Sequence, residues 1–157
     1  MSENLRHFED FEVGETCRFG RYEVTREEVL EFAGKYDPQP FHLDDEAAAK
    51  THFGRLAASG WHTCSMTMAM MVENRRHEPV AALGAAGIDE LRWLRPVYPG
   101  DVLSCETELL EKRRSKSKPG MGILKSRTAT FNQHGEKVLE MVSIIMIRTR
   151  EAAGQAG

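Results

Sequence analysis

The feature that most constrains the fold is an uncharged run from Leu56 to Val72, the longest in the chain. The run contains Ser, Thr, His and Gly, and it is too short and too polar for a membrane span. It predicts instead a buried helix, "GWHTCSMTMAMMVEN", that begins near Gly60 and carries no charge before Glu73. A helix that is apolar nearly all round must be covered by other structure, so the rest of the chain has to supply that cover.

The cover is predicted to be a sheet. A strand-like segment at Cys17 to Val24 precedes the helix, and four more follow it: "GIDELRWLRPV", "DVLSCETELLEK", "GILKSRTATFNQ" and "KVLEMVSIIMIRTR". All four have β-branched or alternating residues and are bounded by turn chemistry. Pro99-Gly100-Asp101 forms one turn, and His134-Gly135-Glu136 joins the last two strands as a hairpin. The expected class is therefore α+β, with a curved antiparallel sheet around a long apolar helix.

Two shorter helices are predicted upstream of the apolar one. Thr25 and Glu28 form a capping-box pattern before "REEVLEFAGKY", and this helix should end near Gly34. Asp44 is placed to cap a second short helix, "DEAAAKTHF".

The length of 157 residues fits one domain over 1–150, followed by a flexible tail over 151–157. The net charge of −3 gives no basic field for nucleic acid. The three cysteines, Cys17, Cys64 and Cys105, are odd in number and far apart, so neither a zinc site nor a disulfide framework is expected. The N-terminus has no apolar core of the kind found in secretory signals, and we expect a cytoplasmic protein.

A stiff segment with two ionisable side chains lies between the two short helices, in "YDPQPFHLDDE". Asp37 and His42 are five residues apart, which is not a helix-face spacing. Pro38 and Pro40 argue against a helix here and favour extended geometry at Asp37 and Gln39, so a stiff, non-helical arm is expected. An Asp-Pro pair is also common turn chemistry, so these residues alone are weak evidence for catalysis.

The wider pattern resembles a known family. "YDPQPFH" followed by "AASGWHT" is similar to the MaoC-like dehydratases, the group that includes the (R)-specific enoyl-CoA hydratases, and "DELRWLRPVYPGDVL" resembles the strand-turn-strand of its members. The similarity covers roughly residues 8 to 149. It implies the hot-dog fold, in which an Asp-x-x-x-x-His arm sits above the buried helix.

The resemblance also implies reversible hydration of a 2-enoyl thioester to an (R)-3-hydroxyacyl thioester. Asp37 and His42 would hold the water, and which of them acts as base is left open by their spacing. The N–H of Gly60 would stabilise the thioester oxygen, with Ser59 beside the substrate. Some hydratases of this group have a serine where this chain has Met68, which bears on substrate fit.

Two further features have both a structural and a functional interpretation. The basic run "EKRRSKSKPG" is either a solvated hairpin tip or a site where Lys116 and Lys118 hold the phosphates of coenzyme A. The methionines of the apolar helix either fill the core or line an acyl tunnel.

The expected partner is a small acyl-CoA, with coenzyme A arriving as part of the substrate and no metal or prosthetic group. A homodimer or larger homo-oligomer is expected because one such sheet leaves an edge and an apolar face. Two alternatives remain: a hot-dog thioesterase, against which the lack of Asp or Glu between Gly60 and Val72 counts, and a non-catalytic acyl-thioester-binding protein.

Overall fold

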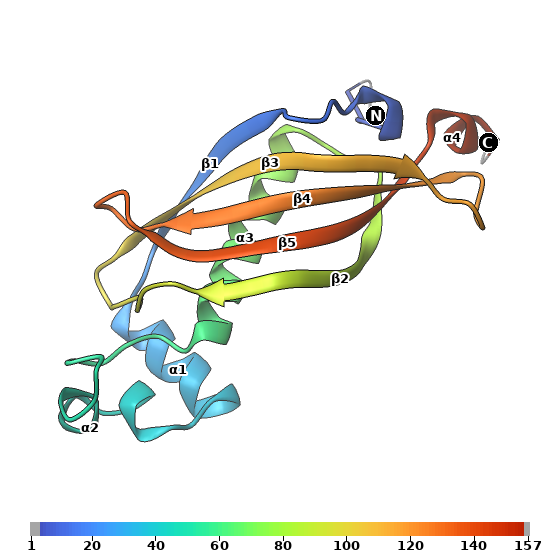
Figure 1. The fold of residues 1–157 in the computed structure, drawn as a ribbon. Helices are drawn as coiled ribbons and strands as arrows, with labels where there is room; N and C mark the ends of the chain where they lie inside the picture. The colour runs from blue at the N-terminus through green and yellow to red at the C-terminus, as the bar shows by residue number, and fades with distance from the viewer. Residues whose placement is uncertain (1–3, 156–157) are drawn as a thin grey trace.

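The computed structural model describes residues 4–155. Figure 1 shows one sheet with a long helix behind it and a group of short helices at one end. The elements in chain order are η1 (Phe8–Asp10), β1 (Thr16–Glu23), α1 (Arg26–Tyr36), η2 (Pro40–His42), α2 (Asp45–Ala49), α3 (Gly60–His77), β2 (Ala82–Trp93), β3 (Val102–Arg114), β4 (Met121–Phe131), β5 (Lys137–Arg148) and α4 (Arg150–Gln155). The predicted α+β class is confirmed.

The five strands are antiparallel and lie in the order β1-β3-β4-β5-β2. The hairpin between β4 and β5 is confirmed, with Thr128 opposite Met141. The register of β1 against β3 shifts between Phe19 and Tyr22. Gly20 lies in this bulge with φ +88°, and a Cβ there would come within 2.7 Å of Met70 Sδ. The glycine therefore lets β1 approach α3 closely.

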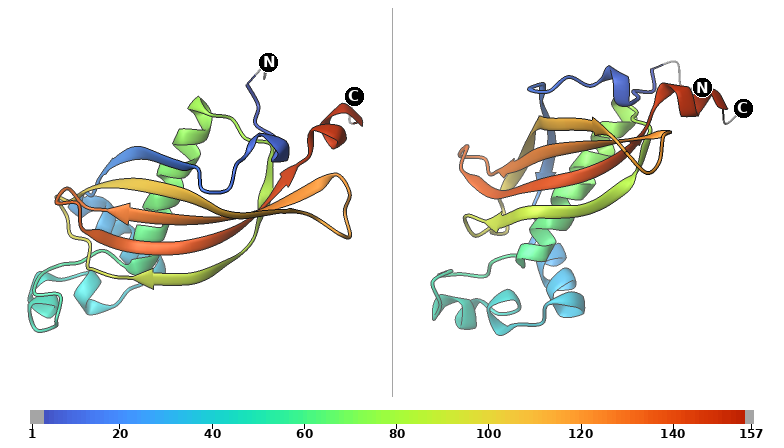
Figure 2. Two further views of the ribbon diagram at one scale, coloured as in Figure 1. Left: turned by 45° about the horizontal axis from the view of Figure 1, so that its top comes forward. Right: turned by 45° about the vertical axis from the view of Figure 1, so that its right-hand side comes forward.

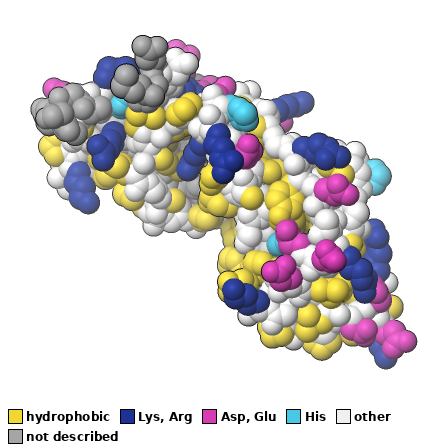
Figure 3. Space-filling view, turned by 180° about the vertical axis from the view of Figure 1, so that it is seen from behind, with side chains coloured by type: hydrophobic (Ala, Val, Ile, Leu, Met, Phe, Trp, Pro, Cys, Tyr) yellow, Lys and Arg dark blue, Asp and Glu magenta, His cyan; other side chains and the backbone are white. Residues whose placement is uncertain are grey.

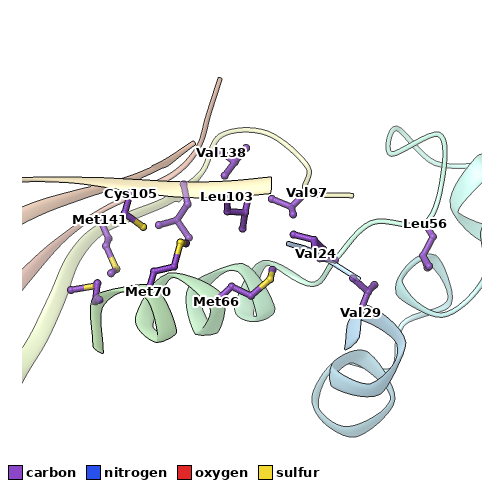
Figure 4. Packing of buried hydrophobic residues seen from close by; sticks show 13 residues of the cluster. Val24, Val29, Leu56, Met66, Met70, Val97, Leu103, Cys105, Val138 and Met141 are labelled. Carbon is purple, nitrogen blue, oxygen red and sulfur yellow. The ribbon is translucent and has the colours of Figure 1, made fainter. Parts of the chain in front are cut away.

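The core lies between α3 and the sheet. Figure 4 shows Met70 of α3 pointing toward the sheet near Leu103, and Met66 pointing toward Val24. Met66 is 1% exposed and Met70 is 3% exposed. These two methionines therefore fill the core, as the structural interpretation of the methionine run predicts.

The outer face of α3 is not covered by any of residues 4–155. Trp61, Met68 and Val72 are exposed on it. Their spacing of seven and four residues places them along one stripe of the helix. Within residues 4–155 the sheet packs on the opposite side of α3 and leaves this stripe exposed.

The lengths of the short elements differ from the predictions. α1 continues past Gly34 to Tyr36, and ends because Asp37 precedes Pro38 and adopts φ −150° and ψ 65°. α2 is confined to Asp45–Ala49, with its predicted cap confirmed by the Asp44 carboxylate, which accepts from the Ala47 N–H.

The C-terminal segment predicted as a tail forms α4 over Arg150–Gln155, and residues 156–157 lie outside the described part. The N–H of Arg150 donates to Glu9 Oε2 at 3.0 Å, which ties α4 to η1. None of the helices within residues 4–155 is long and apolar enough to cross a membrane.

Candidate functional site

The arm that carries Asp37 and His42 is fixed by backbone hydrogen bonds. Asp37 is the C-cap of α1, and its N–H donates to Ala33 O at 2.9 Å. The N–H of His42 donates to Gln39 O at 2.9 Å and closes the single 3-10 turn η2, which begins at Pro40. The prediction of a non-helical arm was therefore wrong at this turn, because proline is favourable in the first position of a helical turn. Gln39 before it is extended as predicted, with φ −83° and ψ 143°.

The Asp37 carboxylate accepts two side-chain hydrogen bonds. Ser59 Oγ donates to Oδ2 at 2.7 Å, and Gln39 Nε2 donates to Oδ1 at 2.6 Å. Burial acts to raise the pKa of Asp37, but the hydrogen bonds from Ser59 and Gln39 and the charge of His42 outweigh it and hold the pKa below its ordinary value. The residue is thus kept as a carboxylate.

The His42 ring is oriented by a backbone carbonyl. Its Nδ1 lies 2.7 Å from Ala57 O, and its side chain is 6% exposed. A carbonyl oxygen only accepts, so Nδ1 carries the hydrogen. In the neutral ring Nε2 then has a free lone pair, and it lies 3.5 Å from Asp37 Oδ2. Two acceptors that face each other in this way can both bind one water molecule through its two hydrogens.

The N-terminus of α3 adjoins this pair and is left uncapped. Ser59 is the N-cap residue, yet its side chain makes no cap hydrogen bond because its hydroxyl points to Asp37. The first N–H groups of a helix have no intrahelical acceptor, and the first turn of α3 contains no acidic residue. The N–H of Gly60 and the positive end of the helix dipole are therefore available to an oxygen that gains negative charge.

Trp93, the last residue of β2, closes over the start of α3. Its indole N–H donates to Gly60 O at 2.8 Å. A Cβ at position 60 would lie 2.6 Å from the indole ring, so glycine is required for this contact. The Trp61 ring stands edge-on to the Trp93 ring, with centroids 5.1 Å apart.

These groups meet in one pocket of about 430 Å³. The pocket is lined by Asp37, His42, His52, Phe53, Ala58, Gly60, Trp61, Thr63, Trp93, Leu94, Arg95, Pro96 and Val97. A hollow of about 740 Å³ between β1 and β3 contains none of the predicted site residues. The smaller pocket is the candidate site because it combines the Asp37 carboxylate, the His42 imidazole and the N-terminus of α3.

The structure brings together four of the six residues predicted from the sequence. Asp37, His42 and Gly60 line the pocket, whereas Ser59 is completely buried and contacts Asp37. We therefore assign Ser59 to the positioning of Asp37. Gln39 and the two tryptophans were missed, and no local sequence signal identifies Trp93, whose position depends on the pairing of β2 with β5.

The two predicted lysines lie elsewhere. Lys116 and Lys118 belong to the loop between β3 and β4. Figures 1 and 2 place this loop at the end of the sheet opposite α1 and α2. The structure of a single chain therefore does not bring these lysines to the pocket.

A second set of ionisable side chains links β1, α1 and α3. Glu28 Oε1 accepts from the Tyr22 hydroxyl and contacts His62 Nε2 at 3.1 Å. Burial and the Glu28 carboxylate raise the pKa of Tyr22 to about 12. The His62 ring stacks on Phe32 at 4.8 Å. Half of the predicted capping box is confirmed, since the Glu28 N–H donates to the Thr25 hydroxyl. The Glu28 side chain does not complete the box but contacts His62, which links α1 to α3.

Comparison with known proteins identifies the family. The model of the MaoC-like domain matches residues 10–130. The uncharacterised protein YdeM of Bacillus subtilis is 29% identical over 140 residues, which cover 89% of this chain and 97% of that protein. The structure of the MaoC-like dehydratase from Rhodospirillum rubrum is 40% identical, with a TM-score of 0.84 over 92% of this chain and 98% of that one. R-hydratase PhaJ1 of Pseudomonas aeruginosa is 26% identical, with a TM-score of 0.68 over 92% and 86%.

Three observations indicate the same family. They are the sheet packed on α3, the arm that carries Asp37 and His42, and the match over residues 10–130. The protein has the hot-dog fold, and the chain belongs to the MaoC-like dehydratase family.

Proposed function

We propose that the protein hydrates a 2-enoyl-CoA reversibly to an (R)-3-hydroxyacyl-CoA. The observation that carries this proposal is the pairing of the Asp37 carboxylate with the Nε2 of His42, 3.5 Å apart, beside the uncapped start of α3. Hydration of a conjugated thioester needs a base for water, a proton for C2 and a donor for the thioester oxygen. We assign the first two roles to His42, assisted by Asp37, and the third to the N–H of Gly60.

In the proposed reaction one water molecule provides both added groups. His42 Nε2 accepts a proton as the water oxygen bonds to C3, and the double-bond electrons move toward the thioester oxygen. The same proton then passes from Nε2 to C2, which restores the ring and regenerates the thioester carbonyl. Because OH and H arrive from one side of the plane, the addition is syn. Asp37 orients the water and stabilises the transient imidazolium.

The thioester oxygen is proposed to accept from the Gly60 N–H. Because the Ser59 side chain makes no cap hydrogen bond, this donor is left for an oxygen of the substrate. Charge that develops on the oxygen is further stabilised by the dipole of the 18-residue helix.

The relatives support this choice of reaction. The name of the PhaJ1 structure describes an R-hydratase, and that of the Rhodospirillum protein a MaoC-like dehydratase. A thioesterase that relies on a carboxylate of the central helix is disfavoured, since α3 has no Asp or Glu before Glu73.

Coenzyme A is proposed to enter only as part of the substrate, without a metal or prosthetic group. Lys116 and Lys118 of the same chain lie at the far end of the sheet. If these lysines hold the phosphates of coenzyme A bound in this pocket, they must belong to a second copy of the chain. We also propose a cytoplasmic location, which is supported by three free cysteines.

A homodimer is proposed from the exposed apolar surface of α3 and β2. β2 is an edge strand of the sheet, and Leu83 and Ile88 on it are 41% and 48% exposed. Figure 3 views the molecule from behind the sheet and shows hydrophobic side chains among charged ones across the middle of this face. A second copy would cover the open strand edge and the part of the exposed α3 stripe that Met68 and Val72 form.

The proposed function is tested with 2-enoyl-CoAs of several chain lengths. Hydration removes the conjugated double bond, so the enoyl-thioester absorbance should fall, and chromatography on a chiral phase should identify the (R)-3-hydroxyacyl product. Release of free thiol would identify a thioesterase instead. Tight acyl-CoA binding without turnover of any substrate would refute hydration and favour a binding protein.

A further inference from the structure

The inner end of the candidate pocket is closed by the protein core. Ala58, Thr63 and Val97 line the pocket and are only 6%, 2% and 2% exposed. Figure 4 shows Val97 pointing into the core beside Leu103 and Val24. Because core side chains are close-packed, the floor of the pocket does not lead further into the molecule.

No tunnel along α3 extends this pocket within residues 4–155. A separate pocket of about 130 Å³, lined by charged side chains such as Arg75 and apolar ones such as Met71 and Leu124, shares no lining residue with the candidate pocket. The buried side chains of Met66 and Met70 occupy the core along α3. The alternative that the methionines line an acyl tunnel is therefore not supported.

Two partly exposed aromatic rings, Trp61 at 58% and Trp93 at 44%, form one side wall of the pocket. Trp93 is held by its hydrogen bond to Gly60 O, and Trp61 packs edge-on against it. Phe53 faces the same pocket, and its carbonyl oxygen accepts from the Tyr98 hydroxyl at 2.7 Å. Trp93 is therefore held against α3, and Phe53 is held by Tyr98 of the segment after β2.

From this geometry we infer that the protein selects short acyl groups and that the Trp61–Trp93 wall determines this selectivity. The inference rests on the proposed function for the orientation of the substrate. The nucleotide part of coenzyme A is large and charged and must point to solvent, so the acyl group takes the closed inner end. A chain that exceeds the distance to the floor meets Val97 and the tryptophan wall.

The test measures binding and does not depend on turnover. Calorimetry compares the unreactive butanoyl-CoA and octanoyl-CoA on the wild-type protein. Each of the additional methylenes in octanoyl-CoA would tighten binding about fourfold if it were buried. We expect octanoyl-CoA to bind no more tightly than butanoyl-CoA. Octanoyl-CoA binding more than about tenfold more tightly, or no binding of either thioester, would overturn the inference.

Variants then test the wall itself. Trp61→Ala should raise the affinity for octanoyl-CoA relative to butanoyl-CoA by about tenfold or more, since it opens the wall and lets methylenes be buried. Trp93→Phe retains a ring but loses the indole N–H, so it should leave this ratio nearly unchanged. Val13→Ala is the control, because Val13 is also exposed, at 58%, but lines none of the pockets described above. An unchanged ratio in Trp61→Ala would overturn the assignment.

The two tryptophans also provide a direct reporter. They are the only tryptophans in the chain, and both line the pocket. Butanoyl-CoA should therefore change the intrinsic fluorescence in step with the calorimetric titration, and binding without a fluorescence change would contradict placement of the acyl group beside this wall. Loss of hydration activity with these binding results intact would refute only the proposed function.

Discussion

The Ser59→Ala variant tests how the Asp37 carboxylate, which we propose to be catalytic, is held in place. Ser59 is completely buried, and its hydroxyl donates to Asp37 Oδ2 at 2.7 Å. A hydrogen bond to a charged group contributes about 1.5–3 kcal/mol. The Asp37 side chain is 17% exposed, so water can replace part of this bond, and we take a loss of about 1.5 kcal/mol. That loss corresponds to an approximately tenfold lower kcat if the bond acts in the transition state.

The same variant should change the pH dependence in a defined direction. The Ser59 bond lowers the pKa of Asp37, so its removal should raise that pKa and move the acidic limb of the kcat profile to higher pH. A carboxylate whose pKa is lower in the folded state than in the unfolded state stabilises the fold at pH values above its unfolded-state pKa. This stabilisation is lost as the pH falls through its folded-state pKa. The difference in unfolding free energy between wild type and Ser59→Ala should therefore shrink from pH 7 toward pH 3.

The assays are hydration kinetics across pH and urea unfolding monitored by circular dichroism. Ser65→Ala is the matched control, because it removes an exposed serine hydroxyl of the same helix that donates to Trp61 O. It should change stability by less than about 0.5 kcal/mol. An unchanged kcat together with an unchanged acidic limb in Ser59→Ala would refute the reasoning.

Three further predictions concern the scaffold around the site. Gly60→Ala places a Cβ 2.6 Å from the indole ring, so the free energy of unfolding should fall by about 1–3 kcal/mol, and kcat should fall with it; a neutral effect would contradict the close packing. Thr67→Val leaves the buried Thr130 hydroxyl without its 2.7 Å partner, so the free energy of unfolding in urea should fall by about 1–3 kcal/mol. The double variant Thr67→Val/Thr130→Val should lose less than the sum of the two single variants. Glu28→Ala should lower the unfolding free energy by about 1 kcal/mol through loss of the contact to His62. Glu28→Gln keeps an acceptor at this position and should retain most of that stability. Equal losses in the two variants would show that the charge of Glu28, and not its geometry, stabilises the fold.

The order of the elements was predictable because each depends on neighbouring residues. The Asp44 cap, the start of α3 at Gly60 and the hairpin between β4 and β5 follow from local patterns that the tertiary structure does not override. Polar side chains recruited by distant partners were harder to predict. Glu28 has the position of a capping-box residue, but Tyr22 and His62 hold its carboxylate instead.

The candidate site was predictable where it lies on one short segment. Asp37 and His42 occur in the same proline-containing arm, so their proximity follows from the sequence. The contact of Trp93 with Gly60 spans 33 residues and depends on strand pairing. The phosphate role of Lys116 and Lys118 was argued from charge alone, and charge does not specify the end of the sheet on which a hairpin lies.

The central claim is that Asp37 and His42 act on one water molecule. The most direct test is kcat/KM for 2-butenoyl-CoA in Asp37→Asn, His42→Gln and the double variant, with circular dichroism to verify the fold. General acid–base groups contribute about 10²–10⁴-fold, so each single variant should lose at least about a hundredfold. The double variant should lose little more than the worse single one, because the two groups act as a unit. Wild-type activity in either single variant would contradict the account.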